Sequence, residues 1–167
     1  LPESISKLQQ LKELDLGLNP LKELPQSIGK LENLEKLSVF QNKLTTLPKE
    51  IGNLSHLKEL NLSNNLLEKL PSEIGNLGSL EKLNLMTNKV TELPQSIKGL
   101  TNLQNLNLSE NLLNKLPSEI GTLKNLENLE LTKNLLDKLP TELGELSKLK
   151  NLSLANNQIA SLPESIG

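Results

Sequence analysis

Apolar residues recur along the whole chain at fixed positions of a 23-residue unit, and this pattern predicts the local structure. Aligned on the Leu-Pro dipeptide that opens each unit, the sequence reads LPxxIGxLxxLxxLxLxxNxLxx, without insertions or deletions. Positions 14 and 16 alternate with polar neighbours, as in Leu60-Asn61-Leu62, which indicates a short strand with one buried face. Because each unit supplies one strand of this kind, the repeat predicts a single parallel sheet.

The repeat also defines the domain organisation. We expect one domain over residues 1–167, built from seven complete units and the start of an eighth. The units are residues 1–23, 24–46, 47–69, 70–92, 93–115, 116–138 and 139–161, followed by 162–167. Almost the whole aliphatic content falls at the seven repeated positions, so the core needs no aromatic residues.

The segment that leads back to the next strand opens with proline and usually contains a glycine. Pro at position 2 fixes φ and suits the first residue of a helical turn. Gly at position 6, present in six of eight places, is expected to close this turn with a positive φ. The fifth unit departs from the pattern, because Ile97-Lys98-Gly99 shifts the glycine by one. The predicted fold is an α/β solenoid, curved and right-handed, with the parallel sheet on the concave face and short 3₁₀ or helical turns on the convex face.

Position 19 is asparagine in every unit. An amide carries both donors and acceptors, so stacked asparagines can satisfy backbone groups that a buried turn leaves unpaired. We therefore predict a structural ladder rather than a binding site. Its members are Asn19, Asn42, Asn65, Asn88, Asn111, Asn134 and Asn157.

The composition offers little catalytic equipment. There is no Cys and one His, so neither a Cys/His metal site nor a thiol or triad nucleophile is expected, and no cofactor is predicted. His56 stands at position 10, where other units carry Gln, Asn, Ser or Lys, which predicts a solvent-facing residue on the convex side. An open sheet face also lacks the enclosed carboxylate pair of a glycosidase. We expect a protein that is not an enzyme.

Charge gives no reason to expect nucleic acid or membrane insertion. The net charge is −2, all 18 cations are Lys, and Arg, the preferred bidentate reader of phosphate and guanine, is absent. No apolar run approaches the 18 residues of a membrane span.

The concave face is therefore the candidate recognition surface. The only Phe and the only Met of the chain, Phe40 and Met86, share position 17 of units two strands apart. A large apolar side chain ringed by polar groups is typical of an interface anchor, although such residues also cover their neighbours. The patch, with four lysines against one glutamate among its charged residues, further contains Lys36, Lys43, Lys82, Lys89, Glu59, Asn61, Ser63 and Asn84. It predicts a partner with apolar and acidic chemistry.

A second apolar set lies at the edge of this face. Leu66, Leu112 and Leu135 share position 20, and Leu18 lies near them in the first unit. Two interpretations stay open: an apolar strip along the edge, or side chains packed over the asparagine turn, which is the favoured one.

Through its LxxLxLxxNxL segment the whole chain resembles the leucine-rich repeat family. The unbroken 23-residue units, rich in Lys and Asn and free of Cys, are most similar to short leptospiral members. That resemblance implies a secreted or surface-exposed bacterial virulence protein with a protein partner on the host cell. Host adhesion proteins, Toll-like receptors and matrix glycans are the implied ligands.

Two alternatives follow from the same resemblance. One is a cytoplasmic scaffold that brings a GTPase and a phosphatase together, as the Ras-group members do. The other is the substrate-binding part of a larger bacterial effector. The absence of Arg favours the bacterial group.

Overall fold

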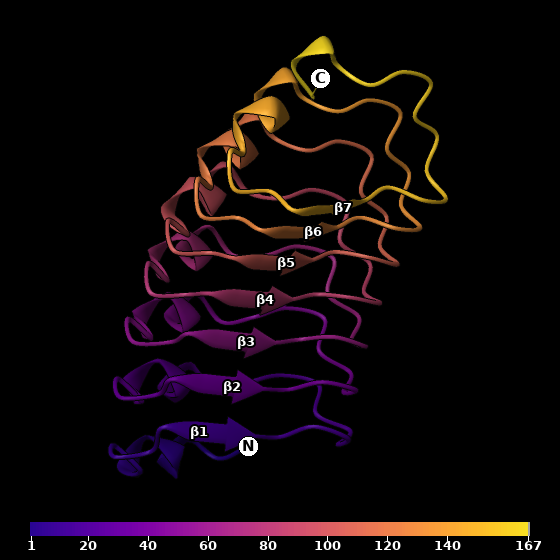
Figure 1. The fold of residues 1–167 in the computed structure, drawn as a ribbon. Helices are drawn as coiled ribbons and strands as arrows, with labels where there is room; N and C mark the ends of the chain where they lie inside the picture. The colour runs from indigo at the N-terminus through magenta and orange to yellow at the C-terminus, as the bar shows by residue number, and fades with distance from the viewer. Residues whose placement is uncertain (167) are drawn as a thin grey trace.

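The computed structural model describes residues 1–166 and shows one open sheet with short helices behind it. The strands are parallel and follow chain order (Figure 1). They are β1 (Glu13–Asp15), β2 (Lys36–Ser38), β3 (Glu59–Asn61), β4 (Lys82–Asn84), β5 (Asn105–Asn107), β6 (Asn128–Glu130) and β7 (Asn151–Ser153). The predicted solenoid is confirmed, and only residue 167 of the partial eighth unit lies outside the described residues.

Each strand is joined to the next through a 3₁₀ helix. The helices are η1 (Glu3–Lys7), η2 (Gln26–Lys30), η3 (Lys49–Asn53), η4 (Ser72–Asn76), η5 (Gln95–Gly99), η6 (Ser118–Thr122), η7 (Thr141–Glu145) and η8 (Glu164–Ile166). In Figure 1 they stack along one side of the coil, away from the strands. The proline precedes each of the first seven helices as its N-cap, with φ between −79° and −65° and ψ between 143° and 153°, and its carbonyl accepts the first helical hydrogen bond.

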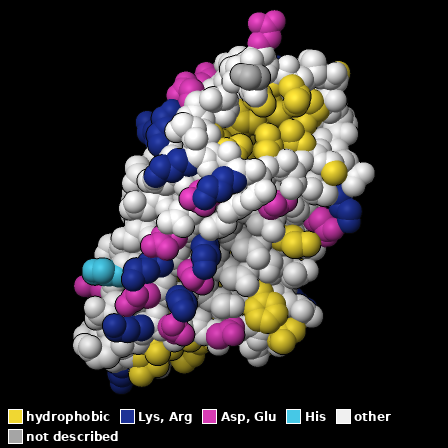
Figure 2. Space-filling view, in the orientation of Figure 1, with side chains coloured by type: hydrophobic (Ala, Val, Ile, Leu, Met, Phe, Trp, Pro, Cys, Tyr) yellow, Lys and Arg dark blue, Asp and Glu magenta, His cyan; other side chains and the backbone are white. Residues whose placement is uncertain are grey.

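The register places identical positions of consecutive units side by side. Leu37, for example, pairs with Leu60, and Leu60 with Leu83. The side chains at positions 14 and 16 point into a core that is continuous from Leu24 to Leu146. Apolar residues of the first and last units are only partly covered, and a broad hydrophobic area is visible at the end of the last repeat (Figure 2).

The glycines at position 6 have a different role from the predicted one. No glycine has a positive φ among residues 1–166, so the expectation that Gly closes the turn in this way is wrong. A Cβ on Gly29, Gly52, Gly75, Gly121 or Gly144 would instead collide with a backbone carbonyl of the following helix. The glycine is needed because consecutive helices stack in direct backbone contact.

Positive φ occurs at position 18, immediately after the concave face. Seven residues there have φ between 51° and 61°, in the left-handed region that L side chains rarely adopt. They are Leu18, Gln41, Asn64, Thr87, Glu110, Lys133 and Asn156. This bend carries the chain from the strand into the asparagine turn.

Candidate recognition surface

The position-19 asparagines form a continuous hydrogen-bonded ladder beside the sheet. Asn88 is representative: its Nδ2 donates to the carbonyls of Leu62 and Leu85 at 3.0 Å, and its Oδ1 accepts the Leu67 N–H at 3.0 Å. Leu62 and Leu67 belong to the preceding unit, so each such amide joins two units. Asn19 has no preceding unit and donates only to Leu16 and Gly17 of its own turn.

Phe40 and Met86 lie at the edge of the strands, and both are half-buried. The Phe40 ring covers Gly17 of the preceding unit so closely that a Cβ on this glycine would overlap it. Phe40 therefore packs on its neighbour while part of the ring remains accessible. Ser63, which separates the two residues along the column, is buried at 7 % exposure. Large and small side chains thus alternate at position 17 from Gly17 to Met86.

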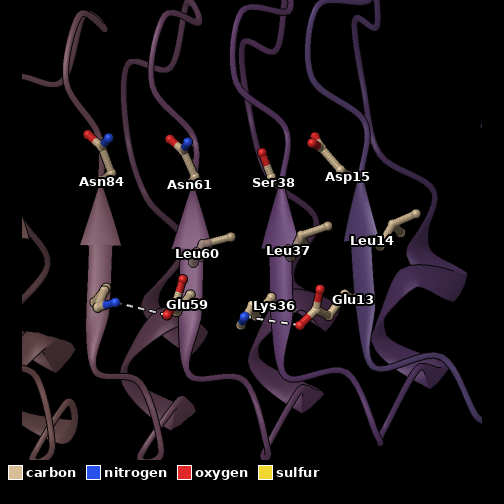
Figure 3. A pocket seen from close by; sticks show the side chains of 11 residues that line it. Glu13, Leu14, Asp15, Lys36, Leu37, Ser38, Glu59, Leu60, Asn61 and Asn84 are labelled. Carbon is tan, nitrogen blue, oxygen red and sulfur yellow. Dashed lines mark hydrogen bonds and ion pairs between the residues drawn. The ribbon is translucent and has the colours of Figure 1, made fainter.

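Charged side chains alternate in sign along position 13 of the first four strands. Lys36 Nζ lies 3.0 Å from Glu13 Oε1, and Lys82 Nζ lies 2.9 Å from Glu59 Oε1. Figure 3 shows the Lys36–Glu13 pair in a row with Glu59. In a parallel in-register sheet identical charges would repel one another, so the alternation converts each contact into an attraction.

The adjacent position 12 shows the same alternation in the opposite phase. Glu35 lies 2.8 Å from Lys58 and 3.4 Å from Lys12. The Lys58 ammonium, with help from Lys12, lowers the pKa of the Glu35 carboxyl below its ordinary value, and Glu35 raises the pKa of Lys58. Glu13 likewise raises the pKa of Lys36 through a hydrogen bond and its charge.

These pairs change the predicted electrostatics of the patch. The sequence count of four lysines against one glutamate leaves out Glu13, which lies beside Lys36, and treats Lys82 as free although Glu59 neutralises it. Lys43 and Lys89, at position 20, are exposed and form no ion pair within residues 1–166. The four lysines and one glutamate of the predicted patch therefore belong to a surface of alternating charge, with two ammonium groups at its edge, those of Lys43 and Lys89, that form no ion pair within residues 1–166.

A shallow groove crosses the first four strands between positions 13 and 15. The backbone at Leu14, Leu37 and Leu60 lines it, with charged side chains along one side and a polar row along the other. Figure 3 shows that polar row as Asp15, Ser38, Asn61 and Asn84. A second groove continues from Lys82 across β4, β5 and β6.

In the second half of the concave face, formed by β5 to β7, strands β5 and β7 contain no charged residue. Asn128 Nδ2 donates to Asn105 Oδ1 at 2.6 Å, and Asn151 donates in turn to Asn128. This second amide ladder takes the place of the ion pairs. Glu110, next to it, has its pKa lowered by Lys133 and by a hydrogen bond from Thr87.

Other residues that the sequence singles out lie at the edges. The side chains of Leu18, Leu66, Leu112 and Leu135 remain 65 %, 39 %, 44 % and 44 % exposed, so the favoured interpretation of packing over the turn accounts for only part of them. His56 is exposed on the helical side, as predicted, and its Nδ1 donates to the Glu32 carbonyl at 2.8 Å.

Within residues 1–166 no group of three or more His, Cys, Asp or Glu side chains is arranged to hold a metal ion. The helices of this same range are all too short to cross a bilayer.

Comparison with known proteins identifies the family. The sequence matches the profile described as leucine-rich repeat region over residues 1–64 and 46–135, and a leucine-rich repeat profile over residues 148–167. The chain belongs to the leucine-rich repeat family. A search of the curated proteins found no match.

Solved structures of leucine-rich repeat proteins resemble the chain along its length. A Leptospira interrogans protein is 44% identical with a TM-score of 0.96, over 99% of this chain and 42% of that one. The ectodomain of the Arabidopsis thaliana receptor kinase GASSHO1/SCHENGEN3, in complex with CASPARIAN STRIP INTEGRITY FACTOR 2, is 37% identical with a TM-score of 0.88. The match covers 99% of this chain and 21% of that one. The leucine-rich repeat domain of the type III effector XopL is 29% identical with a TM-score of 0.88. The match covers 99% of this chain and 60% of that one.

The chain spans less than half the length of the leptospiral and plant proteins. The fold that all of them share is typical of protein–protein interaction modules and is generally a non-catalytic scaffold.

Proposed function

We propose that this chain is a non-enzymatic module that binds a protein partner on its concave face. In this proposal it belongs to a secreted or surface-exposed bacterial protein that recognises host cell-surface molecules, namely adhesion proteins, Toll-like receptors or matrix glycans. The observation that carries the proposal is the open groove over β1 to β4, together with the half-buried Phe40 and Met86 two residues beyond the ends of β2 and β4.

Physical differences between the two faces support the concave face as the binding surface. The helical side repeats one contact in nearly every unit, because the position-6 glycine leaves no space between backbones. The concave side varies from unit to unit, from ion pairs over β1 to β4 to amides over β5 to β7. Aromatic and Met side chains surrounded by polar groups are enriched where proteins bind one another.

The similarity to the leptospiral protein, at 44% identity, supports the bacterial setting. The plant receptor ectodomain is in complex with CASPARIAN STRIP INTEGRITY FACTOR 2, which supports the binding of a partner by this type of coil.

A capture experiment tests the proposal. The immobilised chain is exposed to host-cell membrane extract and, separately, to cytosolic extract. We expect capture from membranes, reduced at least tenfold by the double substitution Phe40→Ala/Met86→Ala. The double substitution Leu112→Ala/Leu135→Ala is the matched control, because it removes exposed apolar side chains away from the first groove.

Circular dichroism shows whether each variant keeps the fold, and Met86→Ala alone is the fallback if Phe40→Ala uncovers Gly17 and unfolds the first unit. Unchanged capture by a folded Phe40→Ala/Met86→Ala variant would refute the role of these anchors. The absence of capture from membranes would refute the host-surface assignment.

A second candidate is the substrate-binding part of a larger effector. The leucine-rich repeat domain of XopL, which this chain matches over 60% of that domain's length, favours it. Capture from cytosolic extract alone would support this candidate. The alternative function, a scaffold for GTPase and phosphatase signalling, also predicts capture from cytosolic extract, but the captured proteins would be a GTPase and a phosphatase.

A further inference from the structure

Three asparagines at the ends of adjacent strands present hydrogen-bond donors of fixed orientation. Asn61, Asn84 and Asn107 occupy position 15 of consecutive units, and each Oδ1 accepts the backbone N–H two residues later, at 3.1, 3.0 and 3.0 Å. This bond sets which end of the amide faces the backbone. The Nδ2 groups are left to face away from the turn, and they donate to no protein atom within residues 1–166.

The row lies where a ligand can reach it. Asn61 and Asn84 line the first groove, and Asn84 and Asn107 line the second. The side chains of Asn61 and Asn84 project side by side in Figure 3. Since their orientation is already set by the backbone, binding a ligand costs them little further conformational entropy. The free amide groups select a ligand that carries hydrogen-bond acceptors, such as main-chain carbonyls.

The spacing of the surface restricts the conformation of that ligand. Adjacent strands lie about 4.8 Å apart, so residues two strands apart lie about 9.6 Å apart. This is the separation of Asn61 from Asn107, of Phe40 from Met86, and of the free ammonium groups of Lys43 and Lys89. Because side chains above a concave face converge, a ligand that contacts all three pairs of residues must repeat its chemical groups at a distance slightly shorter than this one.

Three regular conformations can be compared with that distance. A β-strand repeats every two residues at about 6.8 Å and does not fit. An α-helix presents one face every seven residues at about 10.5 Å, which is longer than a converging surface allows. A polyproline II helix repeats every three residues at about 9.3 Å, and its carbonyls make no internal hydrogen bonds. Only the last conformation offers free carbonyls at the required distance.

We propose that Asn61 and Asn107 donate to main-chain carbonyls three residues apart in a polyproline II segment that crosses the strands. Every third side chain of this segment is apolar, so that successive ones pack against Phe40 and Met86, and acidic side chains in the same three-residue period face Lys43 and Lys89. The inference rests on the proposed function, because it assigns the partner class of the same face.

A peptide experiment tests this assignment. The probe is a fluorescein-labelled peptide of four Pro-Leu-Glu repeats, compared with a scrambled peptide of the same composition by fluorescence anisotropy. We expect the periodic peptide to bind the chain at least tenfold more tightly. Equal affinity of the two peptides, or no binding of either at millimolar concentration, would overturn the inference.

The decisive variant is Asn61→Asp. An aspartate keeps the turn, because Asp15 accepts the Gly17 N–H at 2.9 Å at the same position of the first unit. It replaces the free donor with an acceptor, so we expect a folded protein and at least a tenfold loss of peptide affinity. Ser153→Asp, at position 15 of the last unit, is the control for added negative charge and should reduce affinity less than twofold. An unchanged affinity of Asn61→Asp would overturn the inference.

The two proposals fail separately. If the peptide does not bind while capture from membranes still depends on Phe40 and Met86, the inference falls and the proposed function stands. If a glycan binds through Asn61 and the peptide does not, the inference also falls. Peptide binding through Asn61 without capture from membranes leaves the inference standing and removes the host-surface assignment.

Discussion

Substitution of one ladder asparagine, Asn88→Ala, tests how the units are held together. Asn88 is 8 % exposed, and its amide makes bonds to Leu62, Leu67 and Leu85, each at 3.0 Å. The carbonyls of Leu62 and Leu85 each keep a second donor, from Asn65 and Asn111. The Leu67 N–H has no other acceptor within residues 1–166, so the alanine leaves one buried donor unpaired.

The expected loss of stability follows from this inventory. An unpaired buried N–H costs about 1–3 kcal/mol, and the lost bonds to two still-paired carbonyls add about 0.5–1 kcal/mol each. We expect the free energy of unfolding to fall by about 2–5 kcal/mol. The assay is urea denaturation followed by circular dichroism, because the chain has no Trp or Tyr for fluorescence.

The matched control is the same substitution in the first unit. Asn19 is exposed, its Oδ1 accepts no hydrogen bond within residues 1–166, and the Leu16 carbonyl to which it donates also receives a bond from Asn42. We expect Asn19→Ala to cost less than about 1 kcal/mol, since it leaves no buried group unpaired. Equal losses for the two variants, or a loss below about 1 kcal/mol for Asn88→Ala, would refute the ladder argument.

Three further predictions concern packing, backbone strain and charge. Gly121→Ala should destabilise the chain by about 1–3 kcal/mol in thermal denaturation, because its Cβ meets a backbone carbonyl of the next helix, whereas Gly78→Ala, with nothing within 4 Å, should be neutral or stabilising. Gln41→Gly should stabilise the folded chain by about 0.5–1 kcal/mol. The reason is that relief of the left-handed backbone strain at φ 51° outweighs the larger conformational entropy that Gly has in the unfolded chain. An unchanged or lower melting temperature would contradict this. The pKa of Glu35 is lowered in the folded state, so its pair with Lys58 should stabilise fully above pH 4.5 and lose effect as the pH falls through the lower folded value. Melting temperatures of the wild type and Glu35→Gln should therefore converge in acid, and a constant difference down to about pH 2 would contradict the assignment.

The sequence predicts the coil but not all the physical reasons for its repeated columns. The alternation at positions 14 and 16 correctly places strands such as Glu59–Asn61, because inward and outward side chains alternate regardless of long-range contacts. Local turn geometry predicts a positive φ for the glycine column, whereas the structure shows that the limiting contact comes from the next helix. A contact between units leaves no signature within one unit.

The candidate site shows the same division. Phe40 and Met86 stand out by composition alone, but the ring position over Gly17 and the pairing of Lys36 with Glu13 depend on the sheet register. The positive φ at position 18 has no sequence signal, because side chains as different as Leu18 and Glu110 occupy it.

The alternating charges have a consequence for how this coil can be lengthened or shortened. The contacts that join units are nearly the same throughout, so the backbone alone would tolerate loss of any single unit. Removing residues 47–69, however, would place Lys36 directly beside Lys82, and Glu35 beside Glu81, in neighbouring strands. Removing the two units 24–69 would instead place Glu13 beside Lys82, which restores an attractive contact. Along this stretch the unit of gene duplication or of protein engineering is therefore a pair of repeats.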